Sequence, residues 1–240
     1  MIINNVKLVL ENEVVSGSLE VQNGEIRAFA ESQSRLPEAM DGEGGWLLPG
    51  LIELHTDNLD KFFTPRPKVD WPAHSAMSSH DALMVASGIT TVLDAVAIGD
   101  VRDGGDRLEN LEKMINAIEE TQKRGVNRAE HRLHLRCELP HHTTLPLFEK
   151  LAQLGLLDIL SSDYYPASLL DAAFRVADDQ SNRFTLPQAV KLVTKNPAQA
   201  LNLQDRGVIG EGKRADLVLA HRKDNHIHID HVWRQGKRVF

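Results

Sequence analysis

The sequence is poor in cysteine and in long apolar runs, and each lack excludes a class of protein. The single cysteine, Cys137, excludes a disulfide bond within the chain and is typical of a reducing cytoplasm. No apolar run approaches the roughly 18 residues that a membrane-spanning helix needs. The first residues also lack the charged start and apolar core of a signal peptide. We therefore expect a cytoplasmic protein with no membrane partner.

A surplus of positive charge is also missing. The formal net charge of −7 argues against nucleic acid as a partner, but it leaves room for a local basic pocket that binds a phosphorylated small molecule. The chain has 240 residues, of which 42% are hydrophobic and 25% charged, as in an ordinary globular protein. This length allows one large domain, alone or with a small satellite. The sequence leaves open whether the protein forms a homo-oligomer.

Both ends of the chain have the pattern of short β-strands. Alternating runs flank the dipeptide Asn23-Gly24, which is a strong signal for a β-hairpin, and the last residues repeat this pattern. Neither end carries enough apolar surface to fold by itself. We therefore predict one small β-sandwich domain composed of residues 1–49 and 207–240, with the rest of the chain inserted in it.

The middle of the chain, residues 50–206, alternates apolar strands with amphipathic helices. Such alternation is typical of parallel α/β architecture, so we predict a partial TIM-like barrel. Strands are expected at residues 89–95, 132–139 and 156–163, and helices at 108–123 and 185–203. Residues 49–206 number only 158 (206 − 49 + 1), whereas a complete barrel has about 250.

The ends of three expected strands carry side chains that bind metals. His55 and Asp57 end a short apolar run, and residues two apart in a strand share a face, so both would point to the same side. Glu138 and Asp163 end two later strands. Imidazole and carboxylate groups suit zinc or a related divalent ion. A carboxylate such as Glu138 can bridge two ions, and Asp163 can accept a proton from water.

Each of these residues also has a plainer explanation that the sequence leaves open. His55 and Asp57 would then be solvated polar residues at a strand end, Glu138 an exposed charge, and Asp163 the N-cap of a helix. A set of basic side chains fits a loop that binds a polyphosphate through ionic hydrogen bonds, and equally a solvated loop. These phosphate-binding candidates are Lys61, Arg66, Lys68 and His80 after the first strand, and Arg136 on the strand that ends at Glu138.

Several runs resemble known proteins. Those that resemble the amidohydrolase superfamily are residues 49–57, 88–94 and 210–218. Those similar to a narrower family, the ribosyl-triphosphate diphosphatases of the carbon–phosphorus lyase pathway, are residues 55–61 with 65–67 and Trp71, and residues 161–166. The last of these runs is similar to that family's final barrel strand.

This resemblance implies a specific reaction, the metal-dependent hydrolysis of α-D-ribose 1-methylphosphonate 5-triphosphate to the 5-phosphate and pyrophosphate in phosphonate catabolism. It implies that His55 and Asp57 are ligands of one or two zinc ions, Glu138 a bridging ligand and Asp163 the general base. The superfamily usually has His-x-His where this chain has His55-Thr56-Asp57. Another amidohydrolase, such as a deacetylase or a cyclic-amide hydrolase, would share this metal site but not the substrate.

The resemblance also indicates that part of the barrel is missing. The family places further strands, with metal-binding histidines, between the Glu138 strand and the Asp163 strand. Here residues 149–154 join the two regions almost directly, and no histidine occurs between His142 and His221. Either the middle strands are deleted near residues 150/151, or the 240 residues are part of a longer molecule. With a real deletion, the chain would be a catalytically silent barrel that binds only metal or partners.

Overall fold

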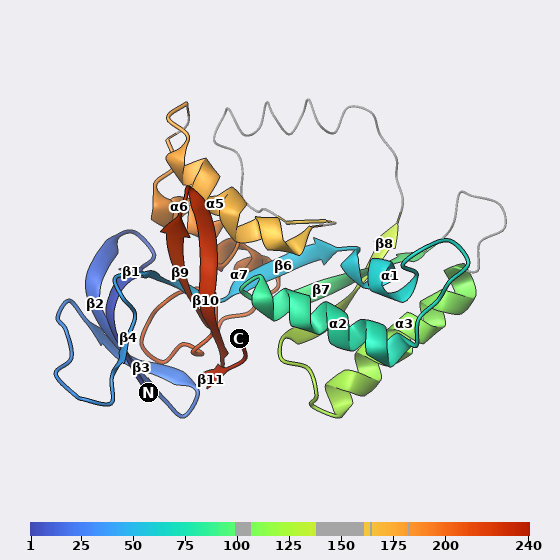
Figure 1. Ribbon diagram of the computed structural model, residues 1–240, viewed down its shortest axis with the longest axis horizontal. Helices are drawn as coiled ribbons and strands as arrows, with labels where there is room; N and C mark the ends of the chain where they lie inside the picture. Colours follow the sequence, from blue (N-terminus) through green and yellow to red (C-terminus); the bar gives the residue numbers. More distant parts are fainter. Residues whose placement is uncertain (99–106, 138–160, 164, 182) are drawn as a thin grey trace.

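A computed structural model describes residues 1–98, 107–137, 161–163, 165–181 and 183–240 (Figure 1). The fold is mixed α/β, as predicted. Among the described residues the strands form two sheets, one built from both ends of the chain and one from its middle. No helix of the described part is long and apolar enough to span a membrane.

The first sheet joins the two ends of the chain. In the order β11-β10-β9-β5-β1-β2-β3, with β4 beside β1, it contains eight strands of the described residues. Strand β5 pairs in parallel with β1 and antiparallel with β9, and so links the two ends. The strands are β1 (Ile2–Val9), β2 (Val14–Gln22), β3 (Glu25–Ala30), β4 (Met40–Asp41), β5 (Trp46–Pro49), β9 (Leu217–Lys223), β10 (His226–Arg234) and β11 (Lys237–Arg238).

The expected hairpin at Asn23-Gly24 is confirmed. Both residues have positive φ, 53° and 84°, which the tight turns of hairpins require at both central positions. The backbone of Ala215 links this turn to the turn before β11, because its N–H donates to Gly24 (2.8 Å) and its carbonyl accepts from Gly236 (2.9 Å). The two edges of the sheet therefore approach each other.

One curled sheet takes the place of the expected sandwich. Apolar side chains from both ends of the chain fill its interior, among them Ile3, Leu8, Leu19, Leu47 and Trp233. Since these side chains come from four different strands at the two ends of the chain, neither end could bury its apolar residues alone. The division into a small domain of residues 1–49 and 207–240 and a second one of 50–206 stays a prediction.

The second sheet is parallel and consists of β6 (Leu51–Thr56), β7 (Ile89–Ile98) and β8 (Glu130–Cys137), in that order. Strands that are covered on both faces are mainly apolar, and β6 and β7 carry buried apolar residues such as Leu51, Ile52, Ile89 and Val92. Helices α2 (Ala73–Ala86) and α3 (Arg107–Lys123) pack against β7, and α1 (Asn58–Phe63) follows β6 directly (Figure 1).

The helix expected at 185–203 is split into α6 (Leu186–Lys191) and α7 (Lys195–Ala200). Thr185 and Gln188 form the predicted capping box at its start. Pro197 lacks the N–H that would bond to the carbonyl of Val193 four residues earlier, and that carbonyl accepts from the N–H of Ile52 in β6 instead (2.9 Å). The break therefore attaches this segment to the parallel sheet.

The described residues do not form a closed barrel. Beyond β6, on the side away from β7, a bridge joins Thr56 to Asp163 in parallel orientation. The expected strand 156–163 lies outside the described residues except for its last three positions. A short 3-10 turn (Pro166–Ser168) and α5 (Leu169–Asp178) follow it.

A candidate metal centre at the end of strand β6

His55 and Asp57 lie where β6 ends and α1 begins. His55 is the penultimate residue of β6, and Asp57 is the N-cap of α1. The distance from His55 Nε2 to Asp57 Oδ1 is 3.9 Å, and the Asp57 side chain is nearly buried. The two side chains are thus close together at the carboxyl end of a parallel strand, the end at which barrel enzymes hold their chemistry.

Asp163 lies against the same strand end although it is distant in the sequence. Its backbone N–H donates to the carbonyl of His55 (3.1 Å), and its carbonyl accepts from the N–H of Asp57 (2.9 Å). Its Oδ1 atom is 3.4 Å from His55 Nε2. Backbone bonds on both sides of Thr56 therefore bring the third carboxylate to the pair.

The donor set of this cluster fits a divalent metal ion. One ligand atom each from His55, Asp57 and Asp163 can be chosen so that all lie within 4.8 Å of one another. Asp163 Oδ1 is shielded from solvent and accepts no hydrogen bond from the described residues, which is unusual for a shielded carboxylate oxygen. One imidazole and two carboxylates are ligands that zinc accepts. The cluster can hold an ion without rearranging the backbone.

Glu53 supports this cluster from inside the sheet, and the sequence reasoning missed it. Its side chain is fully buried; Oε1 accepts from the N–H of His55 (2.9 Å) and Oε2 from the N–H of Ser162 (2.8 Å). Burial raises the pKa of the Glu53 carboxyl to about 7, against the lowering effect of these bonds. A lone charged residue within the apolar run Leu51–Leu54 was the available signal.

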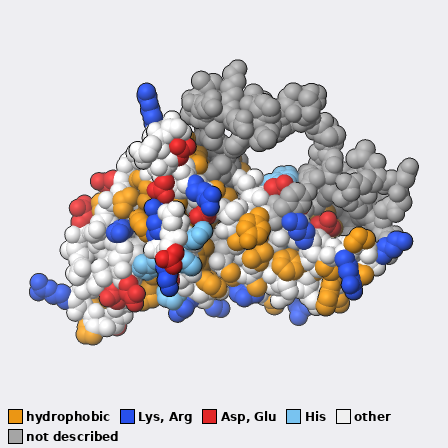
Figure 2. Space-filling model, turned by 45° about the horizontal axis from the view of Figure 1, so that its top comes forward, with side chains coloured by type: hydrophobic (Ala, Val, Ile, Leu, Met, Phe, Trp, Pro, Cys, Tyr) orange, Lys and Arg blue, Asp and Glu red, His pale blue; other side chains and the backbone are white. Residues whose placement is uncertain are grey.

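The other predicted site residues have different outcomes. Glu138 lies outside the described residues, as does the side chain of Arg136. Lys61, Arg66 and Lys68 are exposed on α1 and the loop that follows it. Figure 2 shows Lys and Arg side chains dispersed over the visible face rather than gathered in one patch.

His80 does not lie on an exposed basic loop, where the sequence analysis placed it. His80 is fully buried on α2. Its Nε2 is 2.6 Å from Asp94 Oδ1, and its Nδ1 is 3.1 Å from the Asn58 amide nitrogen. Its position on the inner face of α2, against β7, could not be read from its place in a basic stretch of sequence.

His80 belongs to a buried polar network behind the metal centre. Asp94 of β7 also accepts from His131 Nδ1 (2.8 Å), and His131 Nε2 is 3.1 Å from Asp81 Oδ1. Burial alone would lower the pKa of His131, but the charges of Asp94 and Asp81 outweigh it and raise that pKa to about 9. Burial likewise opposes the low pKa of Asp94, which His131 and His80 hold well below its usual range.

This network also has the composition of a metal site, since His80, Asp94 and His131 offer ligand atoms within 4.8 Å of one another. Hydrogen bonds of 2.6 and 2.8 Å already join these atoms in pairs. All three side chains are buried, so the bonds satisfy groups that would otherwise be costly to desolvate. We therefore interpret the cluster as a structural hydrogen-bond network.

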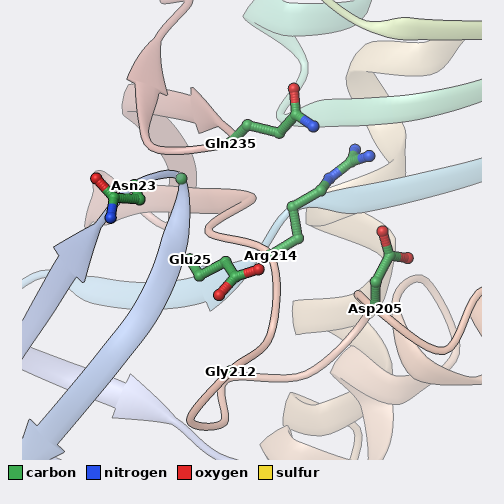
Figure 3. Close-up of a pocket in the computed structure, with 7 residues that line it drawn as sticks. Asn23, Glu25, Asp205, Gly212, Arg214 and Gln235 are labelled. Atoms are coloured by element: carbon green, nitrogen blue, oxygen red, sulfur yellow. The ribbon is translucent and has the colours of Figure 1, made fainter.

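A polar pocket of about 440 Å³ lies beside the β2–β3 turn (Figure 3). Its lining residues are Asn23, Gly24, Glu25, Asp205, Gly212, Arg214 and Gln235. Arg214 Nη1 donates to Glu130 Oε2 (2.9 Å), and Glu130 is the first residue of β8. The pocket is therefore close to the amino end of the parallel strands, whereas chemistry in such folds takes place at the carboxyl end.

Comparisons with known proteins agree with this geometry. Residues 127–240 match the model of the amidohydrolase family. The chain is 64% identical to α-D-ribose 1-methylphosphonate 5-triphosphate diphosphatase of Escherichia coli (strain K12), over 378 residues and 100% of both chains. The chain belongs to the amidohydrolase family. The family is typically metal-dependent, in line with the donor set around His55.

Solved amidohydrolase structures have the same fold at low sequence identity. N-acetylglucosamine-6-phosphate deacetylase from Pasteurella multocida matches with a TM-score of 0.64 at 12% identity, over 99% of each chain. N-isopropylammelide isopropylaminohydrolase from Burkholderia multivorans matches with a TM-score of 0.63 at 16% identity, over 99% of this chain and 97% of the other. At these identities the likeness shows the fold alone.

The comparison with the E. coli relative also reveals a difference in length. The match spans 378 residues, whereas this chain has 240.

Proposed function

We propose that this protein is a metal-dependent diphosphatase that hydrolyses α-D-ribose 1-methylphosphonate 5-triphosphate to the 5-phosphate and pyrophosphate. The observation that carries the proposal is the cluster of His55, Asp57 and Asp163, whose ligand atoms lie within 4.8 Å of one another. The E. coli relative that bears this name supports the choice of substrate.

The chain's own residues would divide the work as follows. His55 and Asp57 would hold the metal, which is zinc in this proposal, and Glu138 would supply a further carboxylate. Asp163 would take the proton from the attacking water, since its Oδ1 accepts no hydrogen bond from the described residues. The metal, when bound, would lower the pKa of a water molecule and polarise a phosphoryl oxygen of the substrate.

The triphosphate itself needs positive charge around it. Lys61 and Arg66 are exposed on the segment that starts directly after Asp57, so they are the first cations along the chain from the metal centre. We assign them to the phosphates that do not react, through charge-assisted hydrogen bonds. Lys68 and Arg136 remain further candidates, and His80 is excluded because it is buried in its own network.

The test is pyrophosphate release by the zinc-loaded protein, with the E. coli relative as positive control. We expect release that depends on added metal and that the double substitution His55→Ala and Asp57→Ala abolishes. A substitution of the exposed His74, which pairs with Glu120 on the far helices, serves as the matched control. Release that is unaffected by the double substitution would contradict the proposal.

A second candidate function follows from the absence of any histidine between His142 and His221. If the reaction needs further histidine ligands there, this chain would bind metal and substrate without turnover. The same assay separates the two candidates when the intact mass is measured in parallel. A molecule of 26.8 kDa that binds zinc but releases no pyrophosphate is the silent form, and rapid turnover by such a molecule supports the first candidate.

A further inference from the structure

We propose that Glu53 is a positioning residue of the metal centre, which clamps the Ser162–Asp163 segment to strand β6. Its two carboxylate oxygens accept backbone N–H groups from the two segments that carry the ligands, His55 on one side and Ser162 on the other. This inference rests on the proposed function, since it concerns the same metal centre. It adds a residue that neither binds the metal nor touches the substrate.

The burial of Glu53 indicates that its carboxylate has a specific task. The side chain is 0% exposed, and among the described residues no cation pairs with it. Burying a carboxyl group costs several kcal/mol unless hydrogen bonds offset the loss of water. An apolar residue at this position would fill the same space at lower cost. An apolar residue could not accept the two backbone N–H hydrogen bonds that the Glu53 carboxylate accepts.

The segment that Glu53 holds is strained and needs support. Asp163 has φ of 54°, in the left-handed region that costs roughly 1 kcal/mol or more for a residue with a Cβ atom. The preceding residue, Ser162, donates its backbone N–H to Glu53, and Asp163 itself is bonded to His55 and Asp57 through its backbone. Strained residues persist where surrounding contacts over-determine them. Glu53 supplies the side-chain part of those contacts.

The consequence for the site is a fixed distance between ligands from different parts of the chain. His55 Nε2 and Asp163 Oδ1 are 3.4 Å apart, and Glu53 is bonded to the backbone of His55 and of the neighbour of Asp163. Residues that orient metal ligands typically change metal affinity by 10- to 100-fold when they are substituted. If Glu53 were only a structural residue, its substitution would lower the stability of the protein but would not change metal affinity through Asp163.

Glu53→Gln is the informative substitution, because glutamine keeps the shape and one acceptor but turns an NH2 group toward the second N–H. The matched control is Glu130→Gln, another carboxylate in a hydrogen-bond cluster, at the opposite end of the parallel sheet. Each is made in the wild type and in Asp163→Asn, and zinc affinity is measured by competition with a chelator. If Glu53→Gln does not fold, Glu53→Asp keeps the charge and withdraws the oxygens by one methylene.

We expect Glu53→Gln to weaken zinc binding by about 10- to 100-fold in the wild type and by much less in the Asp163→Asn background, because it acts through Asp163. Glu130→Gln should change affinity less than about twofold in both backgrounds. Equal losses from Glu53→Gln in both backgrounds, or no loss, would overturn the positioning role while the metal centre stands. A wild type that binds no zinc would overturn the metal centre and this role with it.

Hydrogen exchange of the metal-free protein gives a second, independent readout. We expect Glu53→Gln to increase exchange at the N–H groups of Asp57 and Asp163, which bond across the clamp, and Glu130→Gln to leave them unchanged. Unchanged protection at both groups in Glu53→Gln would show that the clamp does not depend on the carboxylate, and would overturn the proposal.

Discussion

The side-chain hydroxyl of Thr56 donates a 2.7 Å hydrogen bond to the backbone carbonyl of Asp163, 107 positions later in the chain. Thr56 stands between the two ligand candidates His55 and Asp57, so the bond places the carboxylate of the later segment beside them. In a closed barrel the last strand pairs with the first. Here the contact joins residues 161–163 to strand β6 on the side away from β7, although the described strands do not close into a barrel.

Asp163→Asn is expected to slow pyrophosphate release by about a hundredfold or more, because asparagine keeps the shape of the side chain and cannot accept the proton. The measurement is the rate with zinc supplied at saturating substrate. Asp171→Asn, on α5 and paired with Arg175, is the control and should leave the rate unchanged. Equal rates for Asp163→Asn and wild type would remove Asp163 from the mechanism.

Zinc is expected to raise the thermal unfolding midpoint, and a chelator to reverse the rise. A ligand that binds only the folded state stabilises it by about 2.7 kcal/mol at a hundredfold excess over its Kd. Substituting both His55 and Asp57 by alanine should abolish the shift, whereas His74→Ala should preserve it. A shift of the same size in the double variant would place the ion elsewhere.

The buried network predicts that stability falls as the pH rises above neutral. The pKa of His131 is raised from 6.5 to about 9, so its stabilising contribution is complete below about pH 6.5 and lost as the pH rises through 9. The pKa of Asp81 is lowered from 3.8 to about 2, so its contribution is complete above about pH 4 and lost as the pH falls toward 2.

The check is denaturant unfolding between pH 6.5 and 9. Asp81→Asn removes one of the two carboxylates beside His131 and should make the decline shallower, because the pKa of His131 then rises less. Asp230→Asn, at the exposed pair with His221, is the control for loss of a histidine–carboxylate contact. Constant stability of the wild type across this range would contradict the charged state of His131.

Arg66→Ala is expected to raise KM for the triphosphate by roughly tenfold with little change in kcat, since one hydrogen bond to a charged group contributes about 1.5–3 kcal/mol. Lys237→Ala, on β11 of the terminal sheet, removes the same charge far along the chain from the metal centre and should leave KM unchanged. A similar effect of both substitutions would indicate only a change in overall charge.

Several features of the fold depend on local chemistry, and the sequence alone was sufficient for them. Asn23-Gly24 adopts the left-handed turn that few other residues accept. Thr185 and Gln188 cap their helix through bonds within four residues. His55 and Asp57 could be singled out as candidate ligands because the spacing of two such side chains at the end of an apolar run is visible in the sequence, and their role stays a prediction. Family membership followed from such local runs and was confirmed.

Other features depend on which segments pack together, and only the tertiary structure decided them. His80 was assigned to phosphate from its place among basic residues, yet α2 turns it inward to Asp94, because burial is a property of packing and not of neighbouring sequence. Glu53 was not singled out from the sequence, because its partner Ser162 lies 109 positions later in the chain. The sequence determined which candidate ligands the chain carries. Only the tertiary contact of Thr56 with Asp163, 107 positions later, decided that Asp163 lies beside His55.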